Sequence, residues 1–102
     1  MSPEQLSPLK VGVIGLGRFG RLHALTLAGL AEAELVALVA RRQHSLDALA
    51  RELPGVRGWT SLSQALDESD AEAWVIACST TSHVPVASAV LERGKMVLLE
   101  KP

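Results

Sequence analysis

Three glycines near the start of the chain have a spacing that could bind phosphate. Gly15, Gly17 and Gly20 form the pattern Gly-x-Gly-x-x-Gly, directly after the apolar run at residues 11–14 and before a helical pattern. The first glycine would make a tight turn, the second would let the backbone approach a pyrophosphate, and the third would let the helix pack closely on the strand. The start of the helix would add unpaired N–H groups and the positive end of its dipole.

This spacing, with a strand before it and a helix after it, predicts a dinucleotide-binding turn. The alternative is a glycine turn with only a structural role, because so short a pattern also occurs by chance. The strand and helix patterns on either side of the glycines favour a dinucleotide site over a purely structural turn. The residues expected to contact the cofactor in this turn are Gly15, Leu16, Gly17, Arg18, Phe19 and Gly20.

The end of the next apolar run bears on which dinucleotide is bound. Ala40 stands twenty residues after Gly20, where an NAD site usually carries an acid that binds the ribose 2′-OH. Arg41 and Arg42 follow directly, and an arginine can bind a 2′-phosphate through charge-assisted hydrogen bonds. We therefore expect NADP as the cofactor, contacted by Arg41 with Arg42 beside it. NAD is the alternative, in which both arginines are solvated loop residues.

Alternating strand and helix patterns would position these residues. Strands are expected at about residues 10–14, 34–40, 57–60, 73–78 and 96–99, and helices at about residues 19–30, 45–53, 61–67 and 83–93. We expect Ser45 to cap the second helix, Ser61 and Gln64 to form a capping box, and Pro85 to lie in the first turn of the last helix. This alternation predicts an α/β fold, a Rossmann-type doubly wound parallel sheet of about five strands in three layers.

In such a sheet the ligand lies outside the carboxyl ends of the strands, where the strand order reverses. Unusual polar residues stand at those ends, at residues 15–18, 41–42, 79–83 and 100–102. His83 is the histidine best placed for a function, with helix capping or packing as its alternative role. Cys78, at the end of an apolar run, is expected to be a small core residue. The sequence shows no metal-ligand spacing, so no metal is expected.

The composition indicates one soluble globular domain. The chain has 102 residues, of which 48% are hydrophobic and 21% charged, and its formal net charge is −1. These values give no reason to expect a nucleic-acid or membrane partner. The chain shows no secretion signal, and its single cysteine excludes an internal disulfide and fits a reducing compartment. We therefore expect a cytoplasmic protein.

Three segments resemble the N-terminal domain of the glucose–fructose oxidoreductase, inositol dehydrogenase and MocA family. They are residues 13–23, 75–83 and 94–102, and their order and spacing match over nearly the whole chain from Lys10. The ending Glu-Lys-Pro at residues 100–102 is the most family-specific piece. The resemblance implies an NAD(P)-binding domain of an oxidoreductase. Such an enzyme would transfer a hydride between a nicotinamide cofactor and a hydroxyl or carbonyl of a sugar-like or polyol substrate.

The resemblance also implies roles for residues near the nicotinamide. Ser79, Thr80 and His83 would pass near its ribose, and Glu100 would approach the nicotinamide and the substrate. Lys101 matches the family's catalytic lysine, which helps to bind and polarise the substrate hydroxyl or carbonyl. Ser79 departs from the family, which usually has proline there, so this loop loses rigidity.

We expect residues 1–9 to form a flexible leader and residues 10–102 the dinucleotide-binding domain, truncated at its C-terminus relative to the family. The family continues into a substrate domain with a catalytic aspartate and histidine, so this chain alone is expected to lack turnover. A homo-oligomer is expected, through the edge of the strand at residues 96–99 or the sheet face beside it. The alternative functions are a non-catalytic dinucleotide sensor and a nucleotide-free structural domain. A substrate-facing Lys101 favours the dehydrogenase over the sensor.

Overall fold

The computed structural model describes residues 8–78 and 80–99, with the side chains of all of these except residues 18, 19, 80–83 and 99. Strands and helices alternate throughout this part of the chain. They are β1 (Leu9–Ile14), α1 (Arg18–Ala28), β2 (Ala33–Val39), α2 (Gln43–Ala50), β3 (Arg57–Trp59), α3 (Leu62–Glu68), β4 (Ala73–Ile76), α4 (Thr80–Glu92) and β5 (Met96–Leu99).

The strands form one parallel sheet in the order β3-β2-β1-β4-β5. The chain runs outward from β1 through β2 to β3, then returns to the other side of β1 for β4 and β5. The strand order therefore reverses between β1 and β4, which confirms the predicted doubly wound α/β sheet. Continuous apolar runs form the central strands because both faces of those strands are covered by helices.

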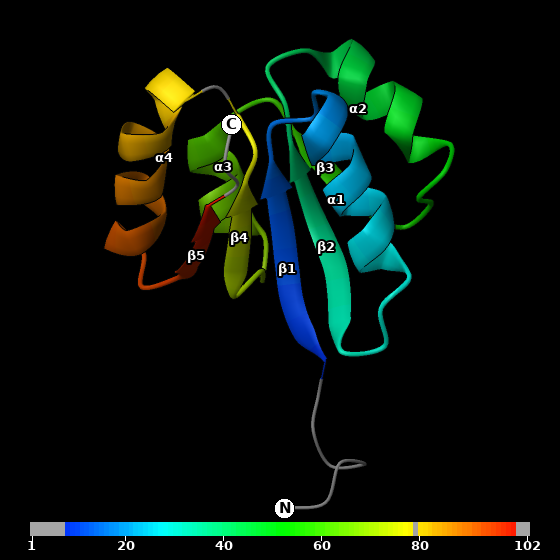
Figure 1. The fold of residues 1–102 in the computed structure, drawn as a ribbon, viewed down its shortest axis with the longest axis horizontal. Coiled ribbons are helices and arrows are strands. Elements are labelled where there is room, and N and C mark those ends of the chain that lie inside the picture. The colour runs from blue at the N-terminus through cyan, green and yellow to red at the C-terminus, as the bar shows by residue number, and fades with distance from the viewer. Residues whose placement is uncertain (1–7, 79, 100–102) are drawn as a thin grey trace, which may run out of the picture.

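The helices form a layer on each face of the sheet (Figure 1), with α1 and α2 on one side and α3 and α4 on the other. Each layer encloses its own core. Val13, Leu38 and Leu49 are buried on the side of α1 and α2. Trp74 and Val90 are buried on the side of α3 and α4, where Trp59 also packs, so both tryptophans are packing residues.

Gly12 is a glycine in the middle of β1 whose presence is explained by Trp74 on the neighbouring strand. A Cβ atom at Gly12 would lie 2.3 Å from the indole ring of Trp74. Only a glycine leaves room for this ring, which is completely buried. The pair fixes β4 closely against β1 beside the point where the strand order reverses.

Two predicted helix starts were wrong. α2 begins at Gln43 with Arg42 at its N-cap position, so Ser45 lies inside the helix and does not cap it. The link after β2 is short, and the helix starts as soon as the chain has turned back along the sheet. α4 begins at Thr80, which places Pro85 in the helix interior and not in the first turn, and the missing N–H of the proline removes one helical hydrogen bond. The predicted cap of α3 is confirmed, because Ser61 Oγ accepts a hydrogen bond of 3.3 Å from the backbone N–H of Gln64.

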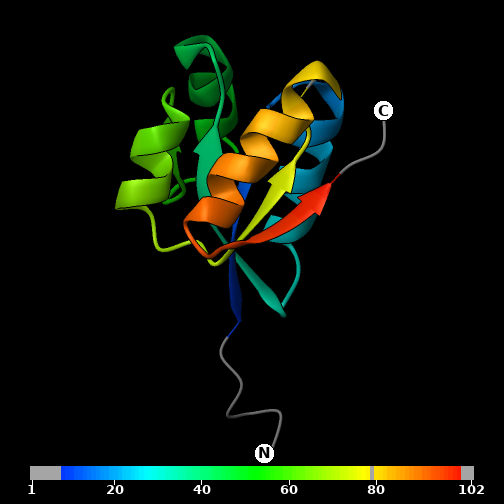
Figure 2. The same cartoon turned by 90° about the vertical axis from the view of Figure 1, so that its left-hand side faces the viewer.

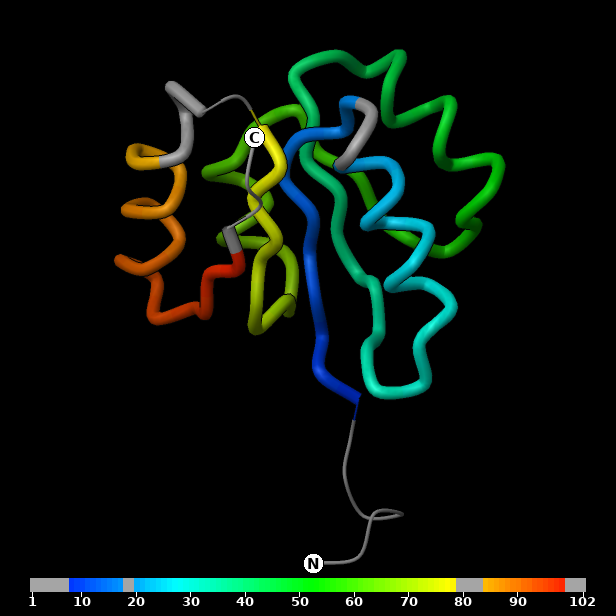
Figure 3. Tube along the Cα trace, in the orientation of Figure 1, coloured from blue at the N-terminus to red at the C-terminus, as the bar shows by residue number. Residues whose placement is uncertain are grey.

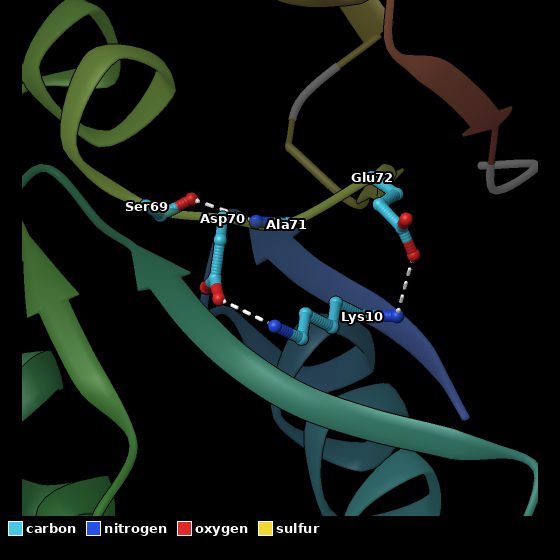
Figure 4. A network of polar contacts seen from close by, with 5 residues as sticks. All are labelled: Lys10, Ser69, Asp70, Ala71 and Glu72. Carbon is cyan, nitrogen blue, oxygen red and sulfur yellow. Dashed lines mark hydrogen bonds and ion pairs between the residues drawn. The ribbon is translucent and has the colours of Figure 1, made fainter. Parts of the chain in front are cut away.

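A polar network ties the start of β1 to the segment that leads into β4 (Figure 4). Lys10 Nζ lies 2.7 Å from a carboxylate oxygen of Asp70, and the backbone N–H of Lys10 donates to the Glu72 carboxylate at 3.3 Å. Ser69 Oγ accepts from the N–H of Ala71 at 3.3 Å. The Lys10–Asp70 pair lowers the pKa of Asp70 and raises the pKa of Lys10, chiefly through the hydrogen bond between them. These contacts lie at the amino ends of the strands, away from the glycine turn.

Candidate dinucleotide site

The turn after β1 has a backbone conformation that requires glycine at its first position. Gly15 has φ of +93°, in the left-handed region, and its N–H donates to the carbonyl of Val39 at 2.8 Å. A Cβ atom at Gly15 would lie 2.8 Å from the backbone nitrogen of Cys78. The turn is therefore held between the ends of β2 and β4, as the predicted role of Gly15 requires.

The second and third glycines of the motif lie in opposite surroundings. Gly17 is exposed at the N-cap of α1, and a Cβ atom there would have no heavy atom within 4 Å. At Gly20, by contrast, a Cβ atom would lie 1.7 Å from the carbonyl oxygen of Gly15. Gly20 thus lets α1 rest directly on the turn, whereas Gly17 leaves the backbone open to a ligand.

A hollow of about 380 Å³ opens over this turn at the carboxyl end of the sheet. Figure 3 shows the segments that follow β1, β2 and β4 at this same end. Besides the turn, the wall is formed by Ala40, Arg41, Arg42, Ser45 and Cys78. Two of these side chains are cationic, and no carboxylate is found among the lining residues that the structure describes, so this part of the hollow suits an anion.

A second hollow, of about 170 Å³, lies on the side of α3 and α4 and shares Gly15, Ala40, Arg41 and Cys78 with the first. Its remaining lining is mostly apolar and consists of Ile14, Val39, Thr60, Leu62 and Val86. Arg41 therefore borders both hollows. Among the described lining residues, the first hollow has two arginines and a serine, whereas the second is smaller and mostly apolar, with Thr60 contributing a hydroxyl group.

Cys78 packs against the core on the side of α3 and α4, as expected, but it is only partly buried. β4 ends at Ile76, so Cys78 lies beyond the strand, half-buried in the wall that the two hollows share. Partial burial raises the pKa of its thiol, while the positive charge of Arg41 acts in the opposite direction. The thiol is therefore neutral at neutral pH, which does not suit a nucleophile.

The structure brings five of the predicted contact residues together around the first hollow: Gly15, Leu16, Gly17, Arg41 and Arg42. Gly20 lies beneath the turn. Arg18 and Phe19 are in the first turn of α1, and Thr80 and His83 in the first turn of α4, but their side chains lie outside the described residues. Ser79, Glu100 and Lys101 also lie outside the described residues.

Several lining residues were not predicted from the sequence. Ser45 was interpreted as a helix cap and Cys78 as a core residue, yet both line the first hollow. Ser45 could have been predicted as a lining residue from the sequence, because a hydroxyl in the first turn after β2 comes close to the end of that strand. Leu62 and Val86 offered no such signal, since an apolar lining residue and an apolar core residue look alike in a sequence.

Residues 9–102 match a family described as an oxidoreductase family with an NAD-binding Rossmann fold, GFO/IDH/MocA. The chain belongs to this family. The match confirms the resemblance found in the sequence and establishes the chain as an NAD-binding oxidoreductase domain. No helix in the described part of the chain has the length and apolar character needed to cross a bilayer.

Several known dehydrogenases and related solved structures are similar to the chain over almost all of its length. An inositol 2-dehydrogenase of Leifsonia xyli is 36% identical over 94 residues, which are 92% of this chain and 28% of that protein. A scyllo-inositol dehydrogenase of Lactobacillus casei, solved with NAD(H) and scyllo-inositol, has a TM-score of 0.85 at 30% identity, covering 94% of this chain and 28% of that one. GenD2 from gentamicin A biosynthesis, solved with NAD, has a TM-score of 0.87 at 33% identity, covering 95% of this chain and 28% of that one.

The chain spans less than a third of the length of the curated relatives that it matches. The matched part is the NAD-binding domain, and the substrate domain of the family is not within it.

Proposed function

We propose that this NAD-binding domain serves the transfer of a hydride between a nicotinamide cofactor and a hydroxyl or carbonyl of a sugar-like or polyol substrate. The observation that carries the proposal is the hollow in which an exposed glycine backbone and two arginines lie together, with no carboxylate among its described lining residues. A pyrophosphate needs such a backbone, and adenosine needs an apolar slot beside it. The inositol dehydrogenases among the relatives support the polyol class.

The described residues fit a dinucleotide. Its pyrophosphate would lie against Gly15 and Gly17, where the N-terminus of α1 adds the positive end of its dipole. The adenosine ribose would lie beside Ala40 and Arg41, at the border of the two hollows. The adenine ring would enter the second hollow, where the hydroxyl of Thr60 can bind a ring nitrogen.

NADP is the cofactor that we propose, with NAD as the alternative. Ala40 has no group that could accept a hydrogen bond from a ribose 2′-OH, and it is buried. Arg41 and Arg42 are exposed in the wall of the hollow, where either guanidinium can bind a 2′-phosphate. One such contact would favour NADP by about tenfold, or about 1.4 kcal/mol. The relatives solved with NAD favour the alternative.

The family pattern supplies the substrate side of the proposal. When bound, the nicotinamide supplies the hydride chemistry. Lys101 would bind and polarise the substrate oxygen, and Glu100 would lie beside it. Ser79, Thr80 and His83 would position the nicotinamide-side ribose from the start of α4.

Three further proposals concern the protein as a whole. We place it in the cytoplasm, as a homo-oligomer, and expect the isolated chain to show no turnover. Turnover requires a substrate enclosed and kept from water with a proton-transfer partner at hand, and those groups belong to the substrate domain of the family. A non-catalytic dinucleotide sensor is the second candidate function, because the same hollow would serve it.

Calorimetric titration of the chain with NADP⁺, NAD⁺ and adenosine tests the cofactor proposal. We expect saturable binding of both dinucleotides, tighter for NADP⁺, and much weaker binding of adenosine, which lacks the pyrophosphate. If neither dinucleotide binds, the alternative of a structural domain without a nucleotide would be favoured. Equal dissociation constants for the two dinucleotides would contradict the NADP preference.

An assay of polyol and sugar oxidation tests the proposed hydride transfer and the role of Lys101. The isolated chain should show no detectable activity with any substrate. Turnover of any of them would show that the substrate domain is dispensable. Joining the chain to the substrate domain of an inositol dehydrogenase relative should restore activity, and Lys101→Ala should then remove it. Activity that survives Lys101→Ala would contradict the role proposed for this lysine.

A further inference from the structure

A further hollow, of about 160 Å³, lies between α1 and α2 beside the dinucleotide site, and we call it the α1–α2 hollow. Both helices are on the same face of the sheet, the far face in the view of Figure 2. Leu16 and Ser45 line this hollow and also the first hollow, so the two adjoin. The α1–α2 hollow is smaller than the roughly 300 Å³ at which pockets for drug-sized ligands begin. It therefore suits a small group and not a whole nucleotide.

On the α1 side, the wall of the α1–α2 hollow carries the cationic side chain of Arg21. Arg21 Nη2 donates to a carboxylate oxygen of Glu52, just beyond the end of α2, so an ion pair holds this side chain between the two helices. A guanidinium has five N–H donors, and this contact is made through one nitrogen, so the other nitrogens can serve an anion in the hollow. The described lining of the hollow does not include Glu52.

On the α2 side, the wall consists of one face of that helix. Its residues are His44, Ser45, Ala48 and Leu49. The imidazole of His44 has at least one N–H donor in either protonation state, and Ser45 adds a hydroxyl. Asp47, the acid of α2, lies off this face by helical spacing and accepts a hydrogen bond of 2.9 Å from Gln43. The described lining residues therefore supply donors from both helices and no carboxylate.

We propose that the α1–α2 hollow binds a phosphate group, held by Arg21 from one helix and by His44 and Ser45 from the other. A phosphate group has three strong acceptor oxygens, so donors on opposite walls can bind different oxygens of one group. The planar guanidinium of an arginine matches two of these oxygens at once, and such charge-assisted contacts are strong. The side chains that meet in this hollow are thus those that bind phosphate.

The place of the hollow is compatible with two sources of this phosphate group. One source is free phosphate, or a small phosphate monoester, bound beside the dinucleotide. The other is the 2′-phosphate of NADP, because Ser45 is in the wall of both this hollow and the hollow in which the ribose is proposed to lie. The second source rests on the proposed function. The site itself does not, because inorganic phosphate alone tests it.

Titration of the 102-residue chain with inorganic phosphate at constant ionic strength, followed by amide NMR spectra, tests the site. We expect saturable shifts in the first half of α2. Arg21→Gln and His44→Gln should each raise the dissociation constant of phosphate by about tenfold, the effect of one lost charge-assisted contact. Arg51→Gln is the matched control for the loss of a positive charge, because Arg51 is an exposed arginine at the other end of α2. Shifts that do not saturate, or equal constants in the parent and both site variants, would overturn the proposal.

Glu52→Gln separates phosphate binding from a merely structural effect of the ion pair. This variant breaks the pair with Arg21, as Arg21→Gln does, but it keeps the guanidinium and removes a competing negative charge. It should therefore bind phosphate at least as tightly as the parent. If Glu52→Gln weakens phosphate binding as much as Arg21→Gln does, the pair acts only by holding the helices together, and the proposal is overturned.

Addition of each dinucleotide to the phosphate-bound chain distinguishes the two sources. Displacement of phosphate by NADP⁺ but not by NAD⁺ supports the site, with the 2′-phosphate as its ligand. Phosphate that stays bound with either dinucleotide present supports the site, with free phosphate as its ligand. Displacement by NAD⁺ as well would place the phosphate on the glycine turn and overturn the proposal. Failure of both dinucleotides to bind in direct titration would contradict the proposed function and leave the result with phosphate alone unchanged.

Discussion

Gly20 lies so close beneath Gly15 that a Cβ atom on Gly20 would come within 1.7 Å of the Gly15 carbonyl oxygen. Gly17, between them in the same motif, has open space where its Cβ atom would be. One glycine is therefore required by the fold and the other by access to a ligand. Substitutions at the two positions should have different effects, one on stability and the other on binding.

Gly20→Ala should destabilise the protein. The added methyl group cannot fit without moving α1 away from the turn, and overpacking of this kind costs about 1–3 kcal/mol. Urea unfolding measures the change in the free energy of unfolding. Gly29→Ala at the other end of α1 is the control, because its Cβ atom would lie 3.6 Å from the nearest atom, the Thr26 oxygen. Similar midpoints for the two variants would show that α1 does not rest on the turn as described.

Gly17→Val should leave the fold intact and weaken dinucleotide binding at least tenfold, or about 1.4 kcal/mol. The valine side chain would extend into the hollow where the pyrophosphate is proposed to lie. Calorimetry measures the affinity, and a melting curve shows that the fold is retained. Gly29→Val carries the same change at the far end of the same helix and should bind like the parent. Near-normal affinity of Gly17→Val would remove the basis for the proposed site.

Much of this fold could be predicted because its signals are local. The apolar runs of β1, β2 and β4 and the glycines after β1 each follow from neighbouring residues, and their alternation determines the sheet type. The clearance between Gly12 and Trp74 could not be predicted in the same way. These residues are far apart in the sequence, and nothing in either strand indicates which residue of the other lies opposite.

The candidate site was predicted only where its residues carry a distinctive chemistry. The glycines and Arg41 stand out by type and spacing, and the structure places them around one hollow. Cys78 was assigned to the core and does pack against it, but β4 ends two residues earlier, so Cys78 also lies in the wall of the hollow, which the sequence did not indicate. Strand ends depend on where pairing with β1 and β5 stops, which is a property of the assembled sheet.

Arg41→Ala should remove most of a preference for NADP over NAD. The guanidinium borders both hollows, beside the proposed ribose position, so its loss should weaken NADP⁺ binding by about tenfold and leave NAD⁺ binding nearly unchanged. Arg51→Ala is the control, because Arg51 is an exposed arginine at the other end of α2. Parallel titrations with both cofactors measure the ratio. A ratio that is the same in the parent and in Arg41→Ala would contradict this assignment.

Asp70→Asn should reduce stability at neutral pH and have no effect in acid. The hydrogen bond from Lys10 lowers the pKa of Asp70 below its ordinary value of 3.8, so the folded state binds fewer protons there than the unfolded chain does. The contribution of the ion pair is therefore present above that value and is lost as the pH falls through the lower pKa of the folded state. Because the same pair raises the pKa of Lys10, the contribution is also lost when the pH rises through that raised value, above 10.5.

Urea unfolding of the parent and Asp70→Asn across this pH range measures the effect. The difference between the urea midpoints of the two proteins should be constant around neutral pH. It should disappear in acid and again in strong alkali. Both side chains are exposed, so the difference should be small and should shrink in high salt. A difference that persists unchanged into strong acid would show that Asp70 acts through something other than its charge, such as its place in the turn before β4.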